Sequence, residues 1–81
     1  MVKVRLWGSL RQAADGQTEV EVQARSFKEL LDRLAETYPG LAPQIARGVS
    51  LSLDGVIYRE AWFTEIRPES EVVLMPYMTG G

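Results

Sequence analysis

The chain has 81 residues and a formal net charge of −2, and it contains neither cysteine nor histidine. This length and its composition, 46% hydrophobic and 25% charged, fit one small globular domain. The missing residue types exclude disulfides, thiolate metal sites and cysteine or Ser–His nucleophiles, so we expect no metal site and favour a protein acted on by enzymes over an independent enzyme.

Acidic and basic residues alternate along the chain without forming a basic block. We therefore expect no nucleic-acid partner. The sequence also has no apolar stretch of membrane-spanning length and no charged-then-apolar leader, so we expect no membrane partner and a cytoplasmic location.

Two strands are predicted near the N-terminus. Apolar residues alternate with others in residues 2–7 and again in residues 18–24, which is the period of a half-buried strand. Gly8-Ser9 interrupts the pattern, and residues 10–15 leave room for a short turn. Strands this close in sequence favour an antiparallel pair.

An amphipathic helix follows. Ser26 is a preferred N-cap residue, and Glu29 three positions later completes a capping box. Glu29 and Arg33 are spaced for an ion pair, and Pro39-Gly40 ends the helix. The apolar stripe consists of Phe27, Leu30, Leu31, Leu34, Ala35 and Tyr38.

Three further strands are predicted in the second half of the chain. Residues 41–48 indicate a loop, with room for a tight helical turn at 43–46, before a strand at 49–53. Asp54-Gly55 is a strong hairpin signal and leads into a short strand at 56–59. After a turn at 67–70 comes the last strand, at 71–76. Four apolar residues between the short strand at 56–59 and this turn are expected to add bulk at the edge of the core: Ala61, Trp62, Phe63 and Ile66.

This element order predicts an α+β fold. A single amphipathic helix must bury its stripe against one face of the sheet. The order is that of a β-grasp (ubiquitin-like) roll, a mixed sheet of four to five strands with one main helix packed on one face and the last strand parallel to the first at the centre. We expect a β-grasp domain over residues 1–76 and a flexible tail over residues 77–81.

The strand faces predict an exposed apolar surface. If Val4 faces the helix, Trp7 points the other way, and on the last strand Val73 and Met75 point outward. Neighbouring first and last strands would place Trp7, Val73 and Met75 together beside the root of the tail, as at many interfaces. A register shifted by one residue is the alternative, and it would reverse both faces.

The sequence ends in Gly80-Gly81. Two residues without side chains form a thin tip that fits a narrow tunnel and presents the Gly81 carboxylate to a partner. A frayed chain end is the alternative for the dipeptide taken alone.

Together, the predicted fold and this ending resemble the sulfur-carrier family of ubiquitin-like proteins. The nearest branch is the small subunit of molybdopterin synthase (MoaD-like), followed by the thiamine sulfur carrier (ThiS-like). The resemblance spans nearly the whole chain, and its most specific element is a Pro-x-x-x-Gly-Gly motif directly after a final strand. Two departures are Tyr77, where the family commonly has a second proline, and Met75, where it often has an aromatic residue. The segments that carry it are Val2–Gly8, Leu10-Arg11, Glu71–Pro76 and Thr79–Gly81.

The resemblance implies that Gly81 is adenylated and then converted to a thiocarboxylate, with Gly80 needed for passage through the partner's tunnel. It implies three partners: a ubiquitin-activating-type adenylyltransferase, a sulfurtransferase and the larger catalytic subunit of molybdopterin synthase. No cofactor is expected on this chain, because ATP and Mg²⁺ are used by the activating enzyme. The expected partner-binding residues are Trp7, Val73, Met75, Pro76, Tyr77, Met78 and Thr79.

Three other functions remain open from the sequence. The chain is compatible with a carrier for thiamine or tRNA thiolation, and with a protein modifier joined through Gly81 to target lysines. It is also compatible with a β-grasp binding module whose ending is incidental. A thiocarboxylate separates the carriers from the binding module, and high-molecular-weight adducts indicate the modifier.

Overall fold

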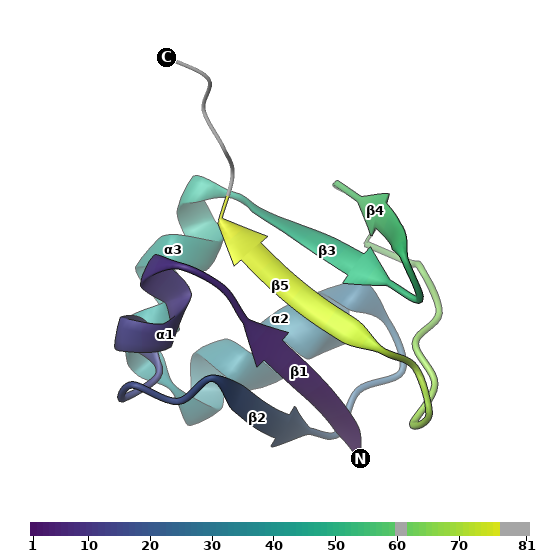
Figure 1. Ribbon diagram of the computed structural model, residues 1–81, viewed down its shortest axis with the longest axis horizontal. Coiled ribbons are helices and arrows are strands. Elements are labelled where there is room, and N and C mark those ends of the chain that lie inside the picture. The colour runs from purple at the N-terminus through teal and green to yellow at the C-terminus, as the bar shows by residue number, and fades with distance from the viewer. Residues whose placement is uncertain (60–61, 77–81) are drawn as a thin grey trace.

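The computed structural model describes residues 1–59 and 62–76, which form one sheet with helices packed against it (Figure 1). The predicted strands and main helix are confirmed, and additional short helices join them. The elements in chain order are β1 (Val2–Leu6), α1 (Ser9–Ala13), β2 (Glu19–Val22), α2 (Phe27–Thr37), the 3-10 helix η1 (Pro39–Leu41), α3 (Ala42–Arg47), β3 (Val49–Leu53), β4 (Val56–Tyr58) and β5 (Val72–Pro76).

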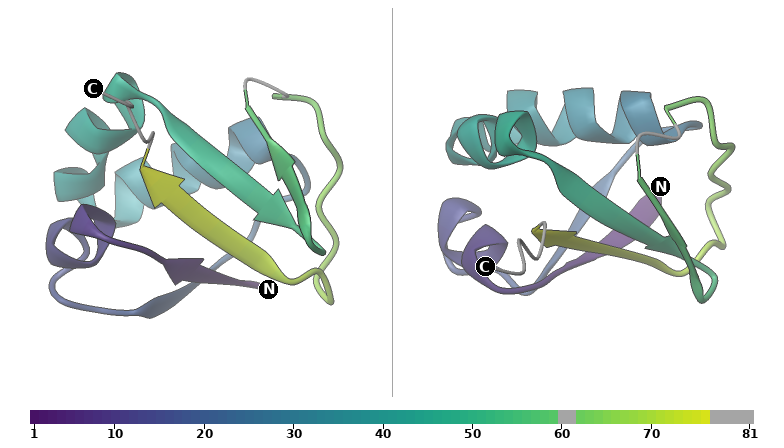
Figure 2. Two further views of the ribbon diagram at one scale, coloured as in Figure 1. Left: turned by 45° about the horizontal axis from the view of Figure 1, so that its top comes forward. Right: turned by 90° about the horizontal axis from the view of Figure 1, so that it is seen from above.

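The sheet has the strand order β2-β1-β5-β3-β4 within the described residues. β1 and β5 pair in parallel, whereas β1–β2, β3–β4 and β3–β5 are antiparallel. Figure 2 shows α2 lying across one face of the sheet with α3 beside it, and α1 near the end of the sheet where β1 and β5 finish. This is the expected β-grasp fold of the α+β class.

Local chemistry accounts for α2. The Oγ atom of its N-cap residue, Ser26, accepts a hydrogen bond of 3.2 Å from the backbone N–H of Glu29. The Glu29 carboxylate accepts one of 3.0 Å from the backbone N–H of Arg25, one residue before the N-cap. Ser26 therefore caps the first turn as predicted, whereas Glu29 accepts from the residue before the N-cap and not from the N-cap N–H that a capping box requires. Arg33 lies 3.9 Å from Glu36 instead of pairing with Glu29 as expected.

Four of the six residues predicted for the apolar stripe of α2 are buried, whereas Ala35 and Tyr38 are half-buried. The fully covered residues of this stripe pack against the inward-facing valines and leucines of β1 and β5, which confirms the predicted register of both strands. The core residues that define the two layers are Val2, Val4, Leu6, Phe27, Leu30, Leu31, Leu34, Val72 and Leu74.

No helix within residues 1–59 and 62–76 is both long and apolar enough to cross a membrane.

Residues 9–13 and 39–47 are helical where the sequence predicts only a short turn and a loop with one tight turn. Leu10 of α1 and Leu41 of η1 are completely buried. Tertiary burial therefore holds segments that are too short to be stable helices alone. Gly40 permits close approach of η1 to α1, because a Cβ atom there would lie 2.7 Å from the carbonyl oxygen of Ala13.

The Asp54-Gly55 hairpin forms as predicted. Both residues have positive φ angles, 49° and 88°, as the favoured two-residue hairpin turns require. The Asp54 side chain accepts a hydrogen bond of 2.8 Å from the backbone N–H of Glu71, and the Asp54 N–H donates one of 2.9 Å to the Glu71 carbonyl. The hairpin is therefore tied to the start of β5.

The connection between β4 and β5 caps α2. The backbone N–H groups of Phe27 and Lys28 donate to the carbonyls of Thr64 and Trp62, at 3.0 and 2.9 Å. These are N–H groups that a helix cannot satisfy internally. The Trp62 ring also packs on Phe27, with 5.5 Å between ring centroids.

The prediction that Phe63, in this same connection, adds bulk to the core is wrong. Ile66 is buried, as expected, but the side chain of Phe63 is 89% exposed, and Trp62 is only partly covered. Trp62 takes the available place against Phe27, so Phe63 is left facing outward. Ala61 lies outside the described residues.

Candidate functional site

The sheet face opposite α2 carries the predicted docking residues in aligned rows. Val73 is the register partner of Arg5 on one side and of Ser52 on the other. Met75 is paired in register with Ser50. The row through Val73 crosses all five strands and consists of Glu19, Arg5, Val73, Ser52 and Ile57.

Trp7 lies where the sequence places it, on this face beside β5. Its backbone N–H donates to the Leu74 carbonyl at 3.0 Å, so the chain continues alongside β5 after β1 ends. The residue is 53% exposed. Val73 and Met75 share the face as expected, but they are half-buried and less exposed than Trp7. They belong to a central strand, where neighbours on both sides cover them.

Gly8 sets the corner between β1 and α1, a role that its interruption of the strand pattern does not reveal. Its φ of 58° and ψ of −136° belong to a region that favours glycine strongly. A Cβ atom at Gly8 would lie 3.5 Å from Cγ of Pro76, the last described residue. This corner therefore packs against the root of the C-terminal segment.

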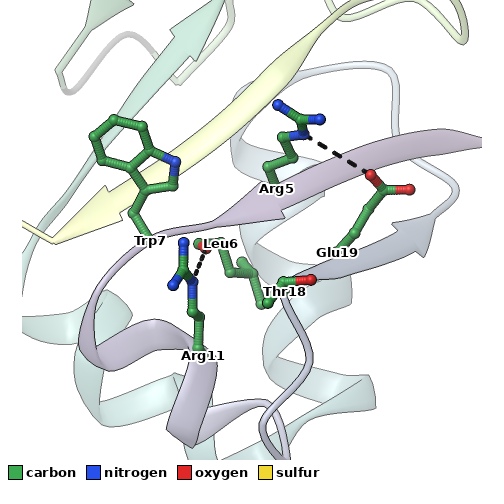
Figure 3. Close-up of a pocket in the computed structure, with 6 residues that line it drawn as sticks. All are labelled: Arg5, Leu6, Trp7, Arg11, Thr18 and Glu19. Atoms are coloured by element: carbon green, nitrogen blue, oxygen red, sulfur yellow. Dashed lines mark hydrogen bonds and ion pairs between the residues drawn. The ribbon is translucent and has the colours of Figure 1, made fainter.

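Two arginines lie close to Trp7. The Nε atom of Arg11 donates a hydrogen bond of 2.9 Å to the Leu6 carbonyl oxygen, and the Nε atom of Arg5 lies 3.9 Å from a Glu19 carboxylate oxygen (Figure 3). All these residues line one shallow pocket of about 250 Å³. The pocket is therefore polar and charged, and it lies beside the apolar side chain of Trp7.

The remaining predicted site residues, Tyr77, Met78, Thr79, Gly80 and Gly81, lie outside the described residues. Their proposed roles stay predictions. Pro76 fixes where this segment begins, at the end of the central strand β5 and beside Trp7.

The described residues contain no group of three or more acidic side chains that could hold a metal ion. The sequence has no histidine or cysteine to add to them.

A model of the ThiS family matches residues 4–81. No curated protein matches the sequence significantly. Several solved structures share the fold at low sequence identity. The chain is similar to a protein in the BexX/CysO complex of Amycolatopsis orientalis, with 17% identity, full coverage of both chains and a TM-score of 0.78.

Two archaeal structures are also similar. Small archaeal modifier protein 1 from Methanosarcina acetivorans has 24% identity over 99% of this chain and 95% of its own, with a TM-score of 0.77. A putative molybdopterin converting factor subunit 1 from Pyrococcus furiosus has 21% identity over 95% of this chain and 97% of its own, with a TM-score of 0.72. Since the family model covers nearly the whole chain, the protein belongs to the ThiS family.

Proposed function

We propose that this protein is a sulfur carrier whose Gly81 carboxylate is adenylated and converted to a thiocarboxylate, and that it serves as the small subunit of a molybdopterin synthase. Its direct partners are a ubiquitin-activating-type adenylyltransferase, a sulfurtransferase and the larger synthase subunit. Because activation uses ATP and Mg²⁺ bound by the adenylyltransferase, we place the protein in the cytoplasm.

The observation that carries this proposal is the match to the ThiS family, which extends through Gly81. The geometry supports it, because the C-terminal segment starts at the centre of the sheet beside exposed Trp7. A partner that docks on this face receives the segment directly. Five residues follow Pro76 in the sequence, and they reach at most about 18 Å when extended.

The composition of the chain fits this chemistry. A Gly81 carboxylate oxygen attacks the α-phosphorus of ATP, pyrophosphate leaves, and an acyl adenylate results. The terminal sulfur of a persulfide then attacks the acyl carbon and displaces AMP. A second thiol then attacks the inner sulfur of the former persulfide, which breaks its S–S bond, forms a disulfide on the partner and leaves the thiocarboxylate on Gly81. Both sulfur groups belong to partners, because this chain has no cysteine.

The pterin acceptor is supported by the similarity to the Pyrococcus furiosus protein, whose description names a molybdopterin converting factor. The similarity to small archaeal modifier protein 1 favours a second candidate, a modifier that conjugates to lysines. Membership of the ThiS family is equally compatible with a carrier for thiamine or tRNA thiolation. These candidates share the activated Gly81 and differ in the acceptor.

Intact-mass measurement tests the shared step. The purified protein is incubated with the activating enzyme of its source organism, ATP, Mg²⁺, a sulfurtransferase and a persulfide donor. We expect the mass to rise by the difference between sulfur and oxygen. A variant without Gly81, and one with an extra alanine after it, should stay unmodified while melting like the parent protein.

Unmodified parent protein, or equal modification of the truncated variant, would contradict the role of Gly81. The intact mass also reports whether Gly81 is the C-terminal residue. Co-purification then identifies the acceptor: we expect the larger synthase subunit, whereas a ladder of lysine conjugates would indicate the modifier.

A further inference from the structure

The pocket beside Trp7 contains more positive than negative charge. It lies between the end of β1, the start of α1 and the chain just before β2, and its charged groups are Arg5, Arg11 and Glu19 (Figure 3). Two guanidinium groups and one carboxylate give it a net charge of one positive unit. An anionic group therefore gains by entering it.

Arg11 is held in a fixed orientation. Its Nε atom donates to the Leu6 carbonyl at 2.9 Å, an oxygen just beyond the last paired residues of β1 and β2. No other hydrogen bond or ion pair joins the Arg11 side chain to the described part of the chain. Its two terminal nitrogens are therefore available as a planar fork, the arrangement that binds a carboxylate through two parallel hydrogen bonds.

Arg5 completes the pocket from β1. The 3.9 Å between its Nε atom and the Glu19 carboxylate exceeds hydrogen-bond length, and both side chains are substantially exposed. Such an exposed pair contributes little stability. Glu19 thus keeps Arg5 near the pocket but leaves its hydrogen-bonding groups open to another anion.

The charge of the sheet face changes sign along β1. A neighbouring hollow shares Arg5 and Glu19 with the pocket and adds Lys3, Glu69 and Glu71, so that its net charge is one negative unit. Positive charge is therefore concentrated at the end where Trp7 and the root of the C-terminal segment lie. This asymmetry favours one orientation of an approaching partner.

We infer that this pocket binds the carboxylate of an aspartate or glutamate side chain on the enzyme that activates the carrier. The inference rests on the proposed function, and it names the chemistry by which that enzyme recognises the carrier. Arg11 and Arg5 act in docking. They are not catalytic residues, because they belong to the body of the domain and the reacting carboxylate belongs to Gly81.

Two measurements test this inference. In the first, the carrier labelled with ¹⁵N is titrated with the peptide acetyl-Gly-Glu-Gly-amide, and the neutral glutamine peptide is the control. We expect saturable shifts of the Arg11 and Arg5 Nε–H signals with the glutamate peptide alone, and loss of the Arg5 shift in Arg11→Gln. Equal responses to both peptides would overturn the pocket, whatever the function of the protein.

In the second, the source organism's activating enzyme catalyses carrier-dependent exchange of pyrophosphate into ATP. Arg11→Gln should raise the KM for the carrier about 10- to 100-fold with little change in kcat, as expected for loss of a charged hydrogen bond. Arg11→Lys, which keeps the charge but loses the fork, should fall between. Arg33→Gln on α2, an exposed arginine away from this face, is the matched control.

If Arg11→Gln and Arg33→Gln give the same KM, the enzyme does not use the pocket and the inference fails. No exchange with the parent carrier would instead contradict the proposed function, and the peptide titration still decides whether the pocket binds carboxylates. Melting of each variant separates a docking defect from unfolding.

Discussion

Replacing Trp7 with alanine should separate partner binding from folding. Trp7 is 53% exposed, on the face that we propose for docking. Tryptophan side chains that become fully buried at an interface often account for much of the binding free energy. We therefore expect Trp7→Ala to reduce the affinity for the activating enzyme much more than it reduces the stability of the domain.

The expected loss of stability follows from the covered area. A tryptophan side chain buries about 150–250 Å² in a core. Roughly half of that, about 100 Å², is covered here, which corresponds to at most about 2.5 kcal/mol. Alanine retains some contact, so we expect a loss of about 1–2 kcal/mol. A domain of this length has a stability of roughly 4–12 kcal/mol and should stay folded.

The assay combines a thermal melt with a binding titration against the activating enzyme. We expect Tm to fall by about 4–16 °C and Kd to rise about 30-fold, the equivalent of about 2 kcal/mol. Phe63→Ala is the matched control, because this aromatic residue is 89% exposed on the connection that caps α2. It should change neither quantity. An unchanged Kd for Trp7→Ala would refute the docking face, and complete unfolding would refute the area argument.

Two further substitutions test the core and the corner. Leu34→Ala removes a completely buried side chain of α2, and a chemical denaturation curve should show a loss of about 2–5 kcal/mol; no loss would contradict the packing of the helix stripe. Gly8→Ala should cost about 1–3 kcal/mol, because alanine is strained at φ 58° and ψ −136°, while its methyl group would only touch Pro76 at 3.5 Å. A Gly8→Ala variant that melts like the parent protein would show that the corner relaxes freely.

The parts of the fold that follow local rules could be predicted from the sequence. The period-two pattern gave the inward face of β1, and Ser26 with Glu29 fixed the start of α2. Asp54-Gly55 identified the hairpin because few residues other than glycine, asparagine and aspartate adopt positive φ angles at low cost. The position of β5 beside β1 then followed, because a single amphipathic helix must pack on one face of the sheet and this element order is that of a β-grasp roll.

Features fixed by tertiary contacts could not be predicted in this way. Helix α1 has only five residues and no side-chain cap, so its sequence carries little helical signal, and buried Leu10 holds it in place. Phe63 is apolar, yet backbone hydrogen bonds between its neighbours and the start of α2 leave it exposed. Composition alone does not show which apolar residues of a loop find a place in the core.

The same distinction applies to the site. The alternation of residues along β1 predicts the face on which Trp7 lies. The orientation of the Arg11 side chain depends on its hydrogen bond to the Leu6 carbonyl, which the sequence does not show. The sequence presents Arg11 as one surface charge among several. The structure brings it beside Arg5 across the turn that Gly8 forms.

Recognition and reaction are assigned to different parts of this chain. The proposed reaction needs only the carboxylate of Gly81 and the absence of side chains near it, which no feature of the sheet face alters. We propose that recognition depends on Trp7, Arg5 and Arg11, which lie on the sheet and its adjoining corner. Since specificity is a difference between affinities for competing partners, substitutions on this face can redirect the carrier to another enzyme without changing its acyl chemistry. The choice of sulfur acceptor is therefore expected to depend on the sheet face, and the capacity to carry sulfur on the two glycines.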